Sequence, residues 1–242
     1  MKSQKLFCIP YVGGSANIIY NGWRRYLDSK ITLIPVEFPG HGKRIKESFS
    51  KDIEELVNDL FDTIIESEIA ECTNYMIYGH SMGTLVIYEL LKLIKAKNYS
   101  LPHTIFLSGR YSPNIIYQKE NVHLLTDEQL IDKLTGLGGI PLDVLNYPEL
   151  IYPFIPIIRN DYKLLDEYEF SLPVSCFDAD IIFTYSNNDP YLDDRKKVDE
   201  WKQYTSKNFS VFEVEGDHFF LKDKIDFLCR LINQSAKRGI KP

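Results

Sequence analysis

The pentapeptide Gly79-His80-Ser81-Met82-Gly83 lies between a short apolar run, residues 75–78, and a long helical pattern that begins at Thr84. A strand, a Gly-x-Ser-x-Gly motif and a helix in this order are typical of a nucleophile elbow, in which a serine sits on a sharp, strained turn. The two glycines fit such a turn because neighbours with side chains would collide with it. We therefore expect Ser81 to present an exposed hydroxyl, with the backbone N–H of Met82 beside it at a helix N-terminus.

Six strand-like apolar runs alternate with helical patterns along the chain. The runs cover residues 6–9, 31–37, 75–78, 104–108, 181–185 and 210–214. Helical periodicity covers about 17–28, 53–65, 84–97, 193–204 and 219–235. Strands separated by helices predict an α/β fold with a mostly parallel sheet that carries helices on both faces.

The stretch from about 111 to 175 interrupts this alternation. It contains a capping-box pattern at Thr126-x-x-Gln129 and a second helical run over about 148–168. Because it is too long for a plain connection, we expect a helical lid over the C-terminal edge of the sheet. Within the apolar run 150–158, Pro153 and Pro156 do not favour one regular helix.

A nucleophilic serine needs a base, and the chain order of this motif is serine, then acid, then histidine. His218 follows the last predicted strand, on a loop at the strand's C-terminal end, where ligand sites gather in open α/β sheets. The other histidines fit less well: one precedes the serine, one is adjacent to it, one precedes a strand and one lies in the lid. They are His41, His80, His103 and His123.

The acid is expected on the loop after the preceding strand, in Ser186-Asn187-Asn188-Asp189-Pro190. We predict Asp189 as the partner of His218, although an Asp before a Pro is also common in ordinary turns. Asp161 in the lid is a competing carboxylate.

The loop after the first strand contains Gly13 and Gly14, which let the backbone approach a substrate. We predict the Val12 and Met82 N–H groups as oxyanion donors.

Length and composition limit the number of domains, the kinds of partner and the cellular compartment. The 242 residues, of which 44% are hydrophobic, suit one α/β domain over 1–242. A net charge of −6 argues against a nucleic-acid partner, and no stretch approaches the apolar length that spans a bilayer. The four cysteines lack a CxxC spacing, which favours reduced thiols in the cytoplasm. We expect a monomer that uses no metal and no cofactor.

The chain resembles the type II thioesterases of nonribosomal peptide and polyketide synthesis, which are related to the medium-chain acyl-carrier-protein hydrolase of animals. The resemblance runs from about residue 8 to 231. Its landmarks are residues 9–16 with Trp23, Phe38-Pro39-Gly40-His41-Gly42, Gly79-His80-Ser81-Met82-Gly83, Pro156-x-x-Arg159-Asn160-Asp161-Tyr162, Asn188-Asp189-Pro190, Trp201 and Gly216-Asp217-His218-Phe219-Phe220.

The resemblance implies an α/β-hydrolase fold and a substrate acyl or aminoacyl group held as a thioester on the phosphopantetheine arm of an acyl- or peptidyl-carrier protein. It also implies a housekeeping role in clearing stalled carriers. We assign Tyr11, Gly13, Gly14 and Asp161 to the substrate-binding surface. The family's lid motif usually reads Arg-Ala-Asp; here Asn160 replaces the alanine, so contacts near Asp161 can differ.

Three other functions share this fold. The first is a medium-chain acyl-carrier-protein hydrolase, and the second is a small-ester hydrolase with the same three residues. The third is a non-hydrolytic carrier-protein partner or acyltransferase, which a degenerate set of residues would have favoured. The apolar run 150–158 also has two interpretations. Its side chains either complete a core against the sheet, or line an acyl channel and meet the carrier protein.

Overall fold

The computed structural model describes residues 3–64, 74–115, 120–140 and 143–239. Its centre is a six-stranded sheet in the order β2-β1-β3-β4-β5-β6, in which all neighbouring strands are parallel. The strands are Gln4–Ile9 (β1), Ile31–Pro35 (β2), Tyr75–His80 (β3), Thr104–Ser108 (β4), Asp180–Ser186 (β5) and Phe209–Val214 (β6). The predicted α/β fold and all six predicted strands are confirmed.

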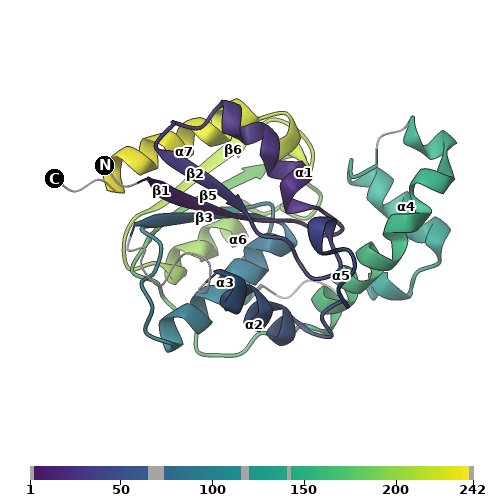
Figure 1. Cartoon of the computed structure of the whole chain (residues 1–242), viewed down its shortest axis with the longest axis horizontal. Coiled ribbons are helices and arrows are strands. Elements are labelled where there is room, and N and C mark those ends of the chain that lie inside the picture. Colours follow the sequence, from purple (N-terminus) through teal and green to yellow (C-terminus); the bar gives the residue numbers. More distant parts are fainter. Residues whose placement is uncertain (1–2, 65–73, 116–119, 141–142, 240–242) are drawn as a thin grey trace.

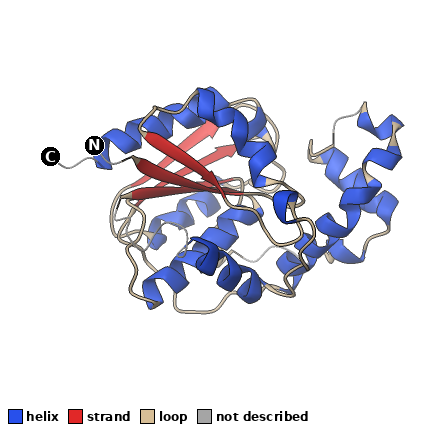
Figure 2. Cartoon of the chain, in the orientation of Figure 1, coloured by secondary structure: helices blue, strands red, loops and turns tan. Residues whose placement is uncertain are grey.

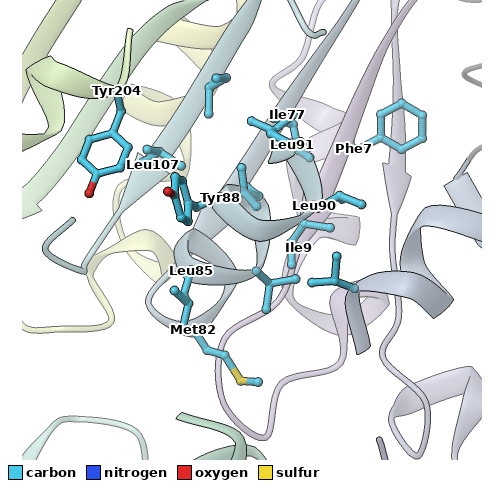
Figure 3. Packing of buried hydrophobic residues seen from close by; sticks show 14 of the residues in the cluster. Phe7, Ile9, Ile77, Met82, Leu85, Tyr88, Leu90, Leu91, Leu107 and Tyr204 are labelled. Carbon is cyan, nitrogen blue, oxygen red and sulfur yellow. The ribbon is translucent and has the colours of Figure 1, made fainter. Parts of the chain in front are cut away.

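Helices cover both faces of this sheet (Figures 1 and 2). One face carries α1 (Ala16–Tyr20) and α7 (Ile225–Gly239), and the other carries α2 (Ile53–Ile64), α3 (Met82–Ala96) and α6 (Arg195–Asp199). The buried strands are apolar on both sides, as parallel sheets require. Figure 3 shows Met82, Leu85 and Leu91 of α3 packed beneath the sheet with Ile9 and Leu107. Residue 65, the last of the predicted stripe of α2, lies outside the described residues.

Three predicted helices outside the lid are composite. The pattern over 219–235 forms a 3-10 helix, Phe220–Lys222, and then α7. The pattern over 17–28 forms α1 and then a 3-10 helix, Asn21–Arg25, and the pattern over 193–204 forms α6 and then a 3-10 helix, Glu200–Tyr204. A 3-10 helix places residues i and i+3 on the same face. That geometry brings Trp201 and Tyr204 into the core together, since both are fully buried.

The predicted helical lid is present. It consists of α4 (Asp127–Gly136), α5 (Ile155–Glu167) and short 3-10 turns at Val122–Leu124, Val144–Asn146, Pro148–Leu150 and Tyr152–Phe154. Residues 116–119 and 141–142 of this segment lie outside the described residues. In Figure 1, α4 stands apart from the sheet and α5 lies between the two. The Thr126–Gln129 capping box is confirmed at the start of α4.

The lid has its own small core. Ile151 and Ile155 pack with Leu130 and Leu134 of α4, separately from the two clusters that cover the sheet. The run 150–158 therefore does not complete the core against the sheet. As predicted, no single helix runs through it: α5 begins at Ile155 and holds Pro156 in its first turn, where a missing N–H leaves no hydrogen bond unmade.

Candidate active site

Ser81 occupies a strained turn between β3 and α3. Its φ of 53° and ψ of −115° are unusual for a residue with a side chain. The flanking glycines are required by space: a Cβ on Gly79 would lie 2.6 Å from the Gly83 carbonyl oxygen, and one on Gly83 would lie 2.7 Å from the Ile9 oxygen. The Ser81 N–H donates to the Ser108 carbonyl at 2.7 Å, which ties the turn to β4.

The structure brings Ser81, His218 and Asp189 together. Nε2 of His218 lies 3.0 Å from Ser81 Oγ, and Nδ1 lies 2.7 Å from Asp189 Oδ2. Because a carboxylate only accepts, Nδ1–H donates to Asp189, and Nε2 is left to accept from the serine hydroxyl. Asp189 is 1% exposed, and its other oxygen accepts the Tyr191 N–H at 3.0 Å. The three loops that supply these residues follow β3, β5 and β6.

The ring of His80 packs against the ring of His218. The two rings are 5.0 Å apart between centroids, and His80 is fully buried, with Nδ1 2.8 Å from Ser108 Oγ. Burial, followed by the neighbouring His218, holds the pKa of His80 well below its usual value. His80 therefore stays neutral and does not compete with His218 for a proton near pH 7.

Residues 11–14 form a tight turn that borders the same cavity. The Gly14 N–H donates to the Tyr11 carbonyl at 2.9 Å, and Gly13 has a φ of +70°, as a type II turn requires of its third residue. Val12 lines the cavity together with Ser81. Met82, whose N–H begins α3, has its side chain fully buried in the core, which fixes the backbone beside the serine.

A cavity of about 520 Å³ opens in front of Ser81 and His218, between the sheet and the lid. Tyr11 is among its lining residues, whereas Gly13, Gly14 and Asp161 are not. Its wall is mixed. The apolar part includes Leu85, Ile115, Leu134, Leu137, Leu165 and Phe170, and the charged part includes Arg110, Glu120, Asp166, Asp193 and Lys197. A second hollow, of about 640 Å³, lies along α2 and contains none of the predicted site residues.

Asp161 is held in a buried network, away from the cavity wall. Its Oδ2 accepts the Gly13 N–H at 2.7 Å and faces His41 Nε2 at 2.9 Å. The other ring nitrogen of His41 lies 3.0 Å from the Pro39 carbonyl oxygen. Both ring nitrogens thus face oxygens that can only accept, so both carry protons and His41 is an imidazolium. The assignment of Asp161 to substrate binding stays a prediction, and its observed contacts are with protein groups.

The pKa of His41 agrees with this geometry. Burial alone would lower it, but the hydrogen bond and charge of Asp161, with the Pro39 carbonyl and Glu37, raise the pKa above its usual value. The other rings beside His41 are those of Phe38 and Phe49, which do not titrate.

We expect the pair to contribute a pH-dependent part of stability. The pKa of His41 in the folded protein is above the unfolded value of about 6.5, so the pair's contribution to the free energy of unfolding is complete below that pH. This contribution is lost as pH rises through the folded pKa, at no more than about 1.4 kcal/mol per pH unit. Denaturant unfolding of wild type and His41→Gln from pH 6 to 9 measures it. The difference in unfolding free energy should shrink as pH rises, and a difference that grows would contradict the charged state of His41.

Glu37 holds the other end of the same loop. Its carboxylate accepts the Ser15 hydroxyl at 2.6 Å, the Ala16 N–H at 2.8 Å and the Asn17 amide at 2.9 Å. These hydrogen bonds outweigh burial and lower the pKa of Glu37. Sequence reasoning gave no role to Glu37 or His41. The one available signal was Phe38-Pro39-Gly40-His41-Gly42, which stood out only as a family landmark.

Comparison with known proteins extends over nearly the whole chain. The family model described as "Thioesterase domain" matches residues 4–236. The gramicidin S biosynthesis protein GrsT of Aneurinibacillus migulanus is 32% identical over 240 residues, which cover 93% of this chain and 88% of that protein. Two solved structures are similar along most of both chains. ClbQ from the colibactin NRPS/PKS pathway is 29% identical, with a TM-score of 0.91 and 98% of each chain covered. The type II thioesterase BorB from the borrelidin biosynthetic cluster is 27% identical, with a TM-score of 0.86 and coverage of 97% of this chain and 93% of that one. The resemblance to type II thioesterases is confirmed, and the chain belongs to the thioesterase family.

Proposed function

We propose that this protein is a serine thioesterase that hydrolyses acyl or aminoacyl thioesters from the phosphopantetheine arm of carrier proteins. One observation carries the proposal: Ser81, His218 and Asp189 form a hydrogen-bonded chain at the base of a cavity, in a member of the thioesterase family. Each distance is within the reach that a nucleophile, its base and an orienting group need.

The proposed chemistry has two halves. His218 Nε2 takes the proton of Ser81 as Oγ attacks the thioester carbonyl, while Asp189 holds the imidazole tautomer and stabilises its charge. The Val12 and Met82 N–H groups stabilise the tetrahedral oxyanion. The protonated His218 then gives its proton to the departing thiol. Water, activated by the same histidine, attacks the acyl-serine and releases the acid and Ser81. No step calls on a metal or a cofactor, and we propose that none is used.

The partner is proposed from the relatives. GrsT is a gramicidin S biosynthesis protein and ClbQ belongs to an NRPS/PKS pathway, so we propose acyl- or peptidyl-carrier domains as the thioester donors and the clearing of stalled carriers as the role. The free, buried Cys8 and Cys229 support a reducing compartment such as the cytoplasm. Within the described residues, no helix combines the length and apolar content that a membrane span needs.

The substrate class can be tested with matched thioesters. Binding energy from the carrier and the arm, remote from the reacting carbonyl, can raise kcat/KM. We expect the same acyl group to react at least about tenfold faster in kcat/KM on a carrier protein than on N-acetylcysteamine. Mass spectrometry of several acylated carriers, with an alkyl ester of the same acid as a control, measures this.

The small-ester alternative makes a different prediction from the same assay. Equal kcat/KM for carrier and short thiol, or a strong preference for the oxygen ester, would support it over the thioesterase. Stable binding of the acyl-carrier without loss of its acyl group would instead support the non-hydrolytic partner.

A further inference from the structure

The lid helix α5 contacts the turn that contains Val12, residues 11–14. The Gly13 N–H, which belongs to the central peptide of the turn, donates to Asp161 on α5, 148 residues later in the chain. Asp161 is 1% exposed. A Cβ on Gly13 would lie 2.5 Å from Cγ1 of Ile158, so α5 also packs directly against the turn.

Asp161 selects one orientation of the turn. The central peptide of a β-turn has two common orientations, which distinguish type I from type II, and Gly13 with a φ of +70° has the second. In the other orientation the Val12 carbonyl would replace the Gly13 N–H and face the Asp161 carboxylate, so that two oxygens would repel. The charged His41, hydrogen-bonded to the same carboxylate oxygen, keeps Asp161 in place.

The residues after the turn are fixed separately. Glu37 binds Ser15, Ala16 and Asn17, whereas the lid carboxylate of Asp161 binds Gly13 within the turn. One carboxylate therefore holds the residues that follow the turn, and another, from the lid, holds the turn itself.

We propose that Asp161 is a positioning residue for the oxyanion hole: by holding the Gly13 N–H it fixes the backbone of residues 11–14, and with it the Val12 N–H of the preceding peptide, so that α5 and this donor move together. The inference rests on the proposed function, since it supposes that Val12 stabilises an oxyanion. It gives the lid a role in assembling the reaction site as well as in covering it.

The test compares Asp161→Asn with Asp127→Asn. Both change a lid carboxylate to an amide, and Asp127 pairs with Arg159 at 2.6 Å without touching the turn.

Without the Asp161 carboxylate charge, His41 becomes neutral and keeps its proton on Nδ1 toward the Pro39 carbonyl. The NH₂ group of the introduced amide therefore turns to Nε2 of His41, and the Gly13 N–H faces a donor. Because small displacements of a catalytic group cost up to about a hundredfold, we expect Asp161→Asn to lower kcat about tenfold to a hundredfold with little change in KM. Asp127→Asn should stay within about twofold of wild type. A role in stability alone would not lower kcat selectively in folded protein.

A second readout is independent of the carrier substrate. An alkyl fluorophosphonate phosphonylates a reactive serine, and its rate depends on stabilisation of the phosphoryl oxygen. We expect Asp161→Asn to slow this labelling by a factor similar to that for kcat. Should Asp161→Asn fail to fold, His41→Gln, which leaves the Asp161 carboxylate on Gly13, should lower kcat and the labelling rate in the same sense by a smaller factor.

The outcomes separate the two proposals. Equal labelling of wild type and Asp161→Asn would overturn the positioning role while leaving the thioesterase intact. If wild type is labelled but hydrolyses no thioester, the proposed substrate is overturned. The labelling rates of wild type and Asp161→Asn would still decide whether Asp161 positions the oxyanion hole. Wild type that is not labelled would overturn both, because there would then be no reactive serine to serve.

Discussion

Ser81→Ala and His218→Ala should each reduce kcat by up to about a millionfold if chemistry limits turnover. Without the hydroxyl there is no nucleophile to form the acyl-enzyme, and without the imidazole nothing removes its proton across the 3.0 Å that separates Nε2 from Oγ. Since the two residues act as one unit, the double variant should lose little more than either single variant. Single-turnover hydrolysis of an acyl-carrier thioester measures all three.

The fold should survive the serine change. Alanine meets the same strain as serine at a φ of 53°, so thermal unfolding of Ser81→Ala should match wild type. Ser206→Ala, an exposed serine beyond β5 whose hydroxyl reaches the Phe177 carbonyl, is the matched control and should keep full activity. Hydrolysis by Ser81→Ala within about tenfold of wild type would remove Ser81 from the mechanism.

The sequence was sufficient for the sheet and for the placement of the site. Apolar runs of strand length are local patterns, and the observed β4 ends at the predicted residues, 104 and 108. The loops after parallel strands share one edge of a sheet, so chain order alone predicted that Ser81, Asp189 and His218 would meet. They meet with distances of 3.0 and 2.7 Å.

The network around the oxyanion turn could not be predicted in the same way. Asp161 and His41 are 120 residues apart, and neither lies in a local pattern that names the other. From the sequence, Asp161 is a competing acid and a substrate contact, because a carboxylate in a lid motif suggests both. Its burial and its bond to Gly13 depend on how α5 docks, which is a tertiary property that periodicity does not contain.

The lid run 150–158 shows the same limit. Its apolar character is clear from the sequence, and its two interpretations are a core against the sheet, or an acyl channel together with a surface for the carrier protein. The structure forms a satellite core within the lid, where Ile151 and Ile155 meet Leu130 and Leu134. Tyr152 and Phe154 are about half exposed, so this part of the lid keeps apolar surface toward solvent.

Asp189→Asn should lower kcat by about ten thousandfold while leaving the fold intact. In wild type the buried carboxylate accepts Nδ1–H of His218 at 2.7 Å, which leaves Nε2 unprotonated toward Ser81. An amide with its NH₂ group toward Nδ1 favours the opposite tautomer, in which Nε2 carries the proton and cannot take another from the serine. The charge that develops on His218 during attack would also lose its counter-charge. Most of the loss should therefore fall on kcat, with KM changed little.

The matched control is Asp194→Asn, the same chemical change five residues away. Asp194 caps α6 by accepting the Lys196 N–H at 2.8 Å, and Asn is as good a cap as Asp, so both activity and stability should stay near wild type. Raising the pH should not rescue Asp189→Asn, because the defect lies in which nitrogen holds the proton of the neutral ring. Activity of Asp189→Asn within about tenfold of wild type, in protein that unfolds at the same temperature, would mean that another group orients His218. Asp161 could not be that group, because its carboxylate is already bound to Gly13 and His41.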